Sequence, residues 1–300
     1  MIEAAEISKS FGDIKAVDRI SLTIKEGNVF GLIGTNGAGK STFMRVMAGV
    51  LRPDQGTILV DGIPVYESEE AKRKFFYVSD DQFFLLNSTP KDMGCFYKTV
   101  YPEFDENKYS DCLKKFSLDA RRKITTFSKG MKKQLSILLG ICTGTKYLLC
   151  DETFDGLDPV MRQGIKSLFA REMEERGLTP VIASHNLREL EDICDHVGLL
   201  HKGGVLLSKD LLEMKCNIFK VQCVFNDSIM EYEAVTKLDV LKHERRGSLV
   251  TLTIRGEQEE IMNKIQSANP VFSEILPLSL EEIFISETEV VGYDIKKLIF

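Results

Sequence analysis

The chain has 300 residues, 43% of them hydrophobic, and a formal net charge of −6 at pH 7. This length fits one large domain, or one of about 200 residues with a smaller domain beside it, and the composition is that of a globular protein. The negative charge argues against a whole surface that binds nucleic acid. The seven cysteines are odd in number and lack the close spacing of zinc or redox motifs, which favours reduced thiols.

The N-terminus has no apolar run after its first residues, so we predict no signal peptide. The most apolar longer stretch, 135–150, is interrupted by small, polar and charged residues. It falls short of the roughly 20 mostly apolar residues that a spanning helix needs. We therefore expect a soluble cytoplasmic chain, with any membrane-embedded part on another polypeptide.

The first two thirds of the chain alternate between short apolar runs and helical patterns, as an α/β domain does. The predicted strands lie at 20–24, 28–33, 56–60, 74–79, 147–150 and 180–183. Helices are expected at 41–48 and 160–176. Between about 85 and 142 the strand signal is lost, and apolar residues recur at helical spacing.

A different pattern begins after about residue 216. Apolar residues alternate with polar ones around 219–225 and 250–254, which is typical of half-buried strands, and 261–268 fits one face of a short helix. We therefore predict an α/β domain at 1–212, with a helical subdomain at about 85–142. The region 215–300 is expected to hold a small α+β domain, to about 286, and a C-terminal tail.

The most informative segment lies between the expected strand 28–33 and the expected helix 41–48. It satisfies the pattern G-x-x-x-x-G-K-[ST], the phosphate-binding loop of nucleoside triphosphatases. Its residues are Gly34, Thr35, Asn36, Gly37, Ala38, Gly39, Lys40, Ser41 and Thr42. At a strand-to-helix junction, backbone N–H groups and the helix dipole converge on an anion. Lys40 is expected to add a positive charge for the outer phosphates, and Ser41 a hydroxyl for Mg²⁺.

Hydrolysis of a bound triphosphate also needs a metal ligand and a group that orients water. Asp151 ends the apolar run 147–150, which places its carboxylate at the sheet edge where phosphates bind. We interpret Asp151 as a metal ligand. Glu152 follows directly and would point in another direction, free to polarise a water molecule.

Several motifs occur in the order typical of one family. Residues 127–131 read Phe-Ser-Lys-Gly-Met, residues 156–159 read Gly-Leu-Asp-Pro, and His185 follows the apolar run 180–183. With the phosphate loop and the Asp-Glu pair, residues 1–212 resemble the ATP-binding subunits of ABC transporters. The resemblance implies a P-loop NTPase core of the ABC type with a helical subdomain.

The resemblance also implies roles for residues and partners. Ser128 and Gly130 would cover the γ-phosphate held by a second copy, and Asp158 would belong to the family's D-loop at the nucleotide site. His185 would hydrogen-bond the γ-phosphate, and Phe11 would stack on adenine. The cofactors would be ATP and Mg²⁺, and two copies would pack head to tail as a homodimer. The dimer would lie on the cytoplasmic face of a membrane and drive a separately encoded permease of an exporter.

The sequence departs from the family pattern at three places. Lys129 and Met131 replace the more usual Gly and Gln of the signature segment. The expected Q-loop glutamine is replaced by Asp80, with Gln82 two residues on, so Asp80, Asp81 and Gln82 are all candidates to face the metal. Thr153 follows Glu152 where Pro is usual.

Other functions were weighed against transport. The main alternative is a cytosolic ABC-type ATPase acting on DNA or the ribosome, but the chain has one phosphate loop and no heptad run. A nucleotide sensor without hydrolysis is disfavoured by Glu152 and His185. The basic cluster at 121–133 is interpreted as a solvated helical face, so no nucleic-acid partner is expected. The C-terminal region weakly resembles the accessory domain of some drug and peptide exporter ATPases.

Overall fold

A computed structural model describes residues 1–154, 156–191, 193–211, 217–276, 278, 279, 281–283 and 285. The chain divides into two compact units, 1–208 and 209–300. The predicted boundary at 212–215 lies a few residues further along the chain. Within the described residues, every helix is too short or too polar to cross a lipid bilayer.

The first unit begins with an antiparallel sheet in the strand order β2-β1-β4-β5. Its strands are β1 (Ile2–Phe11), β2 (Ile14–Ile24), β4 (Gln55–Val60) and β5 (Ile63–Pro64). A tight turn joins β1 to β2, with Phe11 paired to Ile14 and Ile2 to Ile24. The strand β1 was not predicted, because its apolar residues do not keep a simple alternation; the pairing with β2 is interrupted by register shifts.

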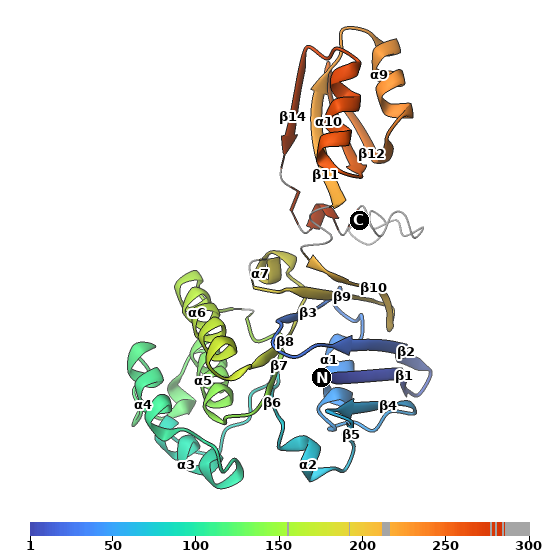
Figure 1. Cartoon of the computed structure of the whole chain (residues 1–300). Coiled ribbons are helices and arrows are strands. Elements are labelled where there is room, and N and C mark those ends of the chain that lie inside the picture. Colours follow the sequence, from blue (N-terminus) through green and yellow to red (C-terminus); the bar gives the residue numbers. More distant parts are fainter. Residues whose placement is uncertain are drawn as a thin grey trace. The chain divides into compact units, whose positions relative to one another are not determined.

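A second sheet of six strands forms the centre of this unit (Figure 1), in the order β10-β9-β3-β8-β7-β6. The strands are β3 (Phe30–Ile33), β6 (Phe75–Val78), β7 (Tyr147–Asp151), β8 (Thr179–Ser184), β9 (His196–His201) and β10 (Gly204–Asp210). The five strands from β9 to β6 run parallel. Every residue of β3, β7 and β8 is buried, as expected for parallel strands covered on both faces. The carboxyl ends of these strands therefore meet at one edge of the sheet.

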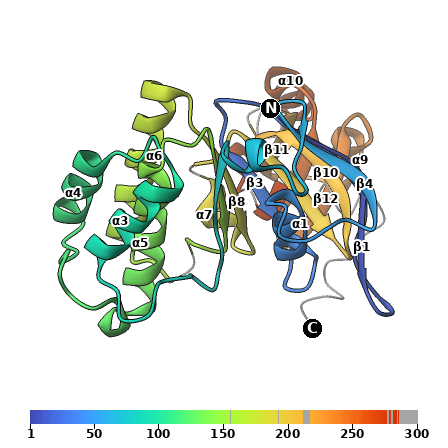
Figure 2. The same ribbon diagram turned by 90° about the horizontal axis from the view of Figure 1, so that it is seen from below.

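Helix α1 (Lys40–Met47) packs its apolar side chains into a core that it shares with both sheets. The other helices of the unit are α2 (Glu69–Lys72), α3 (Pro90–Val100), α4 (Glu106–Lys115), α5 (Lys129–Cys142), α6 (Pro159–Arg176) and α7 (Leu187–Glu191). Figures 1 and 2 both show α3, α4, α5 and α6 gathered on the side away from the antiparallel sheet. Residues 85–142, all described, contain helices and no strand, in agreement with the predicted helical region.

Local sequence signals explain where these helices begin. Thr89 and Asp92 form a reciprocal capping box at the start of α3, with Pro90 in the first turn. Ser128 and Asp158 cap α5 and α6, each by accepting the backbone N–H group three residues on. The signature segment and the Gly-Leu-Asp-Pro segment therefore each deliver a helix N-terminus to the surface.

In the part of the second unit that the structure describes, an antiparallel sheet in the order β12-β13-β11-β14 is accompanied by the helices α9 and α10. The elements are β11 (Ile218–Val224), α9 (Ser228–Thr236), β12 (Asp239–Arg246), β13 (Leu249–Arg255), α10 (Gln258–Ser267) and β14 (Phe272–Leu276). Side chains from β11, β13 and α10 form its own hydrophobic core. An α+β arrangement follows, while the role of this unit as an accessory domain stays a prediction.

Candidate active site

The phosphate loop connects β3 to α1 at the edge where the parallel strands end. Its glycines are required by the backbone. Gly39 has φ 100°, and a Cβ there would lie 2.2 Å from the carbonyl oxygen of Ala16. Gly37 has φ 79° with open space in front of it. Only glycine combines such positive φ values with this close approach, so the loop can turn its backbone amides toward a ligand.

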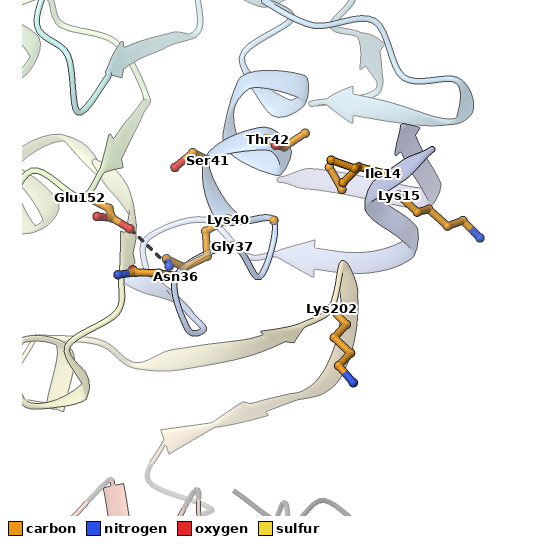
Figure 3. Close-up of a pocket in the computed structure, with 11 residues that line it drawn as sticks. Ile14, Lys15, Asn36, Gly37, Lys40, Ser41, Thr42, Glu152 and Lys202 are labelled. Atoms are coloured by element: carbon orange, nitrogen blue, oxygen red, sulfur yellow. Dashed lines mark ion pairs between the residues drawn. The ribbon is translucent and has the colours of Figure 1, made fainter. Parts of the chain in front are cut away.

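A pocket of about 510 Å³ opens in front of this loop (Figure 3). Its lining residues are Ile14, Lys15, Ala16, Asn36, Gly37, Gly39, Lys40, Ser41, Thr42, Glu152 and Lys202. Three lysines and one carboxylate line the pocket, so its charge suits a polyanion such as a triphosphate. Figure 3 shows Glu152 on one side of Lys40, with Lys15 and Lys202 on the other.

Lys40 is 4% exposed. Its Nζ donates to the carbonyl oxygens of Gly34 and Thr35, at 2.9 and 3.2 Å, and lies 3.3 Å from Oε1 of Glu152. A buried ammonium group is costly unless anionic or strongly accepting groups surround it. Lys40 is thus held beside the loop in the position from which it can meet a phosphate.

Asp151, at the end of β7, is 1% exposed and accepts two hydrogen bonds. Ser41 Oγ donates to its Oδ1, and Tyr77 OH donates to its Oδ2, both at 3.0 Å. Burial raises the pKa of the Asp151 carboxyl, and these two hydrogen bonds oppose that rise. The structure thus brings together Ser41 and Asp151, two of the residues predicted to bind the metal.

A hydroxyl and a carboxylate oxygen are hard ligands of the kind that Mg²⁺ prefers, so this pair fits the predicted ion. The described residues contain no group of three or more His, Cys, Asp or Glu side chains that could hold a metal. Mg²⁺ in phosphate sites commonly takes one or two protein ligands and completes its shell with water and phosphate oxygens. The donor set is consistent with that arrangement.

Glu152 has an unusual backbone, with φ 49°. Its N–H donates to the carbonyl oxygen of Ala183 on β8, at 3.0 Å. One carboxylate oxygen faces Lys40, and the other lies 3.5 Å from Nδ1 of His185. The three residues predicted to be catalytic therefore lie together at the edge of the pocket, with the carboxylate partly open to solvent.

Asp80 and Gln82, the candidate Q-loop residues, are not among the residues that line the pocket. Asp80 Oδ1 lies 2.9 Å from Nζ of Lys133, and Gln82 Nε2 donates to the carbonyl oxygens of Ser79 and Asp80. The backbone of Asp81 accepts a hydrogen bond from Ser79. A metal contact from any of these three residues stays a prediction.

Ser128, Gly130 and Asp158 lie outside the pocket of their own chain. A Cβ on Gly130 would come within 3.1 Å of the carbonyl oxygen of Gly156, so the signature segment and the loop before α6 lie side by side. The two helix N-termini capped by Ser128 and Asp158 form a second surface suited to an anion. Their predicted contact with a nucleotide is therefore not made by the pocket of the same chain.

The chain was compared with known proteins. The family model described as "ABC transporter" matches residues 17–155. The ABC transporter ATP-binding protein YtrB of Bacillus subtilis is 30% identical over 287 residues, covering 96% of this chain and 98% of that protein. The bacitracin transport ATP-binding protein BcrA of Bacillus licheniformis is 29% identical, covering 69% of this chain and 68% of that one. The chain is an ATPase of the ABC transporter family.

Solved structures agree with this assignment. An ATP-binding subunit of an ABC transporter aligns with a TM-score of 0.66 and 25% identity, over 72% of this chain and 92% of that one. A dimeric ATP-binding cassette in a post-hydrolysis state with ADP and Pi aligns with a TM-score of 0.63 and 22% identity, over 70% of this chain and 99% of that one. The predicted family and the P-loop core are thus confirmed.

Some contacts of this ABC ATPase were not expected from its sequence. Phe11 is 48% exposed and is absent from the pocket lining, whereas Ile14 and Lys15 of the next strand line it. Lys202, in the turn between β9 and β10, was also missed, as was the hydrogen bond from Tyr77 to Asp151. No motif marks these residues, because they reach the site only through the sheet order. Stacking of adenine on Phe11 stays a prediction.

Proposed function

We propose that this ABC ATPase binds MgATP in the phosphate-loop pocket, forms a homodimer around two nucleotides, hydrolyses them and thereby drives a separate permease that exports its substrate. The observation that carries the catalytic part is the position of Glu152. Its carboxylate lies between Lys40 and His185 at the mouth of a positively lined pocket. An accepting group at that place suits the orientation and deprotonation of an attacking water molecule.

The residues in and around the phosphate-loop pocket would act on different parts of MgATP and on the attacking water. The loop amides and Lys40 bind the phosphates, and His185 hydrogen-bonds the terminal one. Ser41 and Asp151 would hold Mg²⁺, which would supply positive charge against the bound phosphates. Glu152 accepts the proton of water. The hydrogen bond between Ser41 and Asp151 supports this arrangement, because it puts both metal-binding oxygens within reach of one ion.

The proposed homodimer rests on two half-sites carried by one chain. The pocket supplies the phosphate loop, and the exposed surface around Ser128 and Asp158, which lies outside that pocket, supplies two further helix N-termini. Val160, which follows Asp158 in the first turn of α6, is 77% exposed. A second copy placed head to tail would cover this apolar side chain and add Ser128 and Gly130 to the γ-phosphate of the first.

The proposed permease contact rests on the segment after β6. Phe83, Leu85 and Leu86 are 63%, 38% and 89% exposed. Apolar side chains clustered in this way mark a binding surface for another protein. We assign this surface to the cytoplasmic side of the permease, which places the ATPase on the cytoplasmic face of the membrane.

Export is proposed from the names of relatives. Besides the bacitracin transport protein, the linearmycin resistance ATP-binding protein LnrL of Bacillus subtilis is 31% identical over 212 residues. A relative named for methionine import is 29% identical, so the cassette itself serves both directions. Direction is therefore tested with the permease present, by following a candidate peptide antibiotic across vesicles that contain both proteins.

The decisive experiment uses Glu152→Gln with MgATP. The variant is expected to bind ATP, to release phosphate at least a hundredfold more slowly, and to elute as a dimer in gel filtration. Ser128→Arg in the same background should return it to a monomer while ATP still binds. A Glu152→Gln chain that remains monomeric at saturating ATP, or that hydrolyses ATP at the normal rate, contradicts the proposal.

A further inference from the structure

Lys133 lies on helix α5, which begins in the signature segment. Its side chain contacts two segments that follow different strands, one after β7 and the other after β6. Its Nζ donates to the backbone carbonyl oxygen of Glu152, at 2.7 Å, and lies 2.9 Å from Oδ1 of Asp80. The Lys133 side chain is 13% exposed, whereas that of Asp80 is 59% exposed. One ammonium group therefore ties α5 to the turn after β7 and to the segment after β6.

The contact to Glu152 bears on its backbone conformation. The left-handed φ of 49° is unfavourable for a residue with a side chain, so it persists only where its surroundings fix it. The N–H of Glu152 is held by Ala183 on β8, and its C=O is held by Lys133. Rotation of either peptide group would swing the carboxylate away from Lys40 and His185.

The contact to Asp80 connects Lys133 to the segment after β6, for which we propose a contact with the permease. Asp80 lies a few residues before Phe83 and Leu86, the exposed apolar side chains of the same segment. Its carboxylate supplies the negative charge that draws the Lys133 ammonium to this place. A displacement of this segment would pull Lys133 and change how firmly the Glu152 carbonyl is held.

We propose that Lys133 is a positioning residue for ATP hydrolysis, and that Asp80 links its grip on Glu152 to the segment after β6. The inference rests on the proposed role of Glu152 as the base. Neither Lys133 nor Asp80 lines the pocket, so we expect substitutions of Lys133 to change turnover more than nucleotide affinity.

The test measures kcat and KM for ATP in the full-length chain. Lys133→Met is expected to lower kcat about tenfold or more, with KM changed by less than about threefold, because a small misplacement of a catalytic group costs turnover first. Lys133→Arg, which keeps the charge and donors, should recover most of the loss. Lys114→Met is the matched control, since Lys114 also pairs with an aspartate at 3.2 Å but is 75% exposed on α4. It should leave kcat unchanged.

A charge exchange separates positioning from simple ion pairing. Asp80→Lys combined with Lys133→Glu restores opposite charges, but a carboxylate cannot donate to the Glu152 carbonyl. We expect the thermal unfolding midpoint of this double variant to lie closer to that of the native chain than the midpoints of the two single variants do. Its kcat should stay low. Full recovery of kcat in the exchanged variant overturns the proposal, and so does normal kcat in a folded Lys133→Met chain.

The variant Glu152→Gln separates the proposed positioning role of Lys133 from the proposed role of Glu152 as the base. If Glu152→Gln is inactive and adding Lys133→Met lowers its residual turnover no further, Lys133 acts through Glu152, as proposed. If Glu152→Gln is inactive while Lys133→Met is fully active, the positioning role fails and the base role stands. If Glu152→Gln hydrolyses ATP normally, both fail. Should Lys133→Met not fold, Lys133→Arg and the exchanged pair supply the same decision.

Discussion

Two carboxylates of the first unit, Glu172 and Glu152, are each paired with at least two basic groups, and they differ in how completely they are enclosed. Glu172 on α6 has a fully buried side chain, with Lys108 at 2.9 Å, Arg176 at 2.7 Å and Arg171 at 3.3 Å. Glu152 is 21% exposed, with Lys40 at 3.3 Å and His185 at 3.5 Å. The ion pairs of Glu172 with Lys108 and Arg176 are thus short and enclosed, whereas those of Glu152 are longer and partly open to solvent.

This difference separates Glu172, which stabilises the fold, from Glu152, which can take part in catalysis. Lys108 lies on α4, and Arg176 also donates to the carbonyl oxygen of Ile141 on α5, so Glu172 joins three helices. Its oxygens are fully used, and fully satisfied buried polar networks rigidify a fold. Glu152 keeps accepting capacity toward the pocket, which a base for water requires. Substitutions at the two sites should therefore affect different measurements.

The largest expected effect follows Glu152→Gln, on turnover alone. Removing a general base lowers kcat by about 10²- to 10⁴-fold. Because the Glu152 contacts are long and partly exposed, the free energy of unfolding should change by less than about 1 kcal/mol. Phosphate release and urea denaturation of the same preparation measure both quantities. If Glu152→Gln lowered the free energy of unfolding as much as the loss of a buried ion pair does, Glu152 and Glu172 would not differ in the way proposed.

Lys40→Met is expected to have the next largest effect, on ATP affinity. Hydrogen bonds from a charged donor contribute about 1.5–3 kcal/mol, so losing them to the phosphates should weaken binding ten- to a hundredfold. Isothermal calorimetry with MgATP measures the change. Lys114→Met, at an exposed ion pair, serves as the control and should bind normally. Unchanged affinity in Lys40→Met would place the phosphates elsewhere.

Glu172→Gln should show the opposite pattern from Glu152→Gln. Removing one charge from a buried cluster leaves Lys108 and Arg176 poorly compensated, and we expect a loss of about 2 kcal/mol or more in the free energy of unfolding. The values of kcat and KM should stay within about twofold, since Glu172 is not among the residues that line the pocket. Denaturation midpoints and steady-state kinetics check the two halves of this expectation.

The same substitution tests a pH dependence. Burial tends to raise the pKa of Glu172, but hydrogen bonds from Lys108 and Arg176 outweigh it, so the folded-state pKa is lowered. The stabilisation is then complete above the unfolded pKa of about 4.3 and is lost as the pH falls through the lower folded value. The gap in stability between the native chain and Glu172→Gln should narrow between about pH 5 and pH 3. A gap that stays constant over this interval contradicts the lowered pKa.

Sequence reasoning reached the ABC family and the phosphate loop because these depend on local patterns. The Gly39 and Lys40 spacing, the buried run before Asp151 and the position of His185 are all readable along the chain. The Lys133 contacts, the Tyr77 hydrogen bond and Lys202 at the pocket were not, because each joins residues that only the sheet order brings together. The strand β1 was not predicted for a related reason: its register shifts interrupt the alternation of apolar and polar residues that marks a strand.

The smallest effect is expected at Phe11, which has neither the enclosure of Glu172 nor the position of Glu152. The ring is 48% exposed and Lys9 Nζ lies 5.8 Å from its centre. Stacking of a base on an aromatic ring contributes about 1–3 kcal/mol, and exposure favours the lower end, so Phe11→Ala should weaken ATP binding about fivefold. Inorganic triphosphate, which has no base, should bind the variant and the native chain equally. If the variant loses affinity for both ligands, the aromatic ring supports the fold of the β1–β2 turn and does not contact adenine.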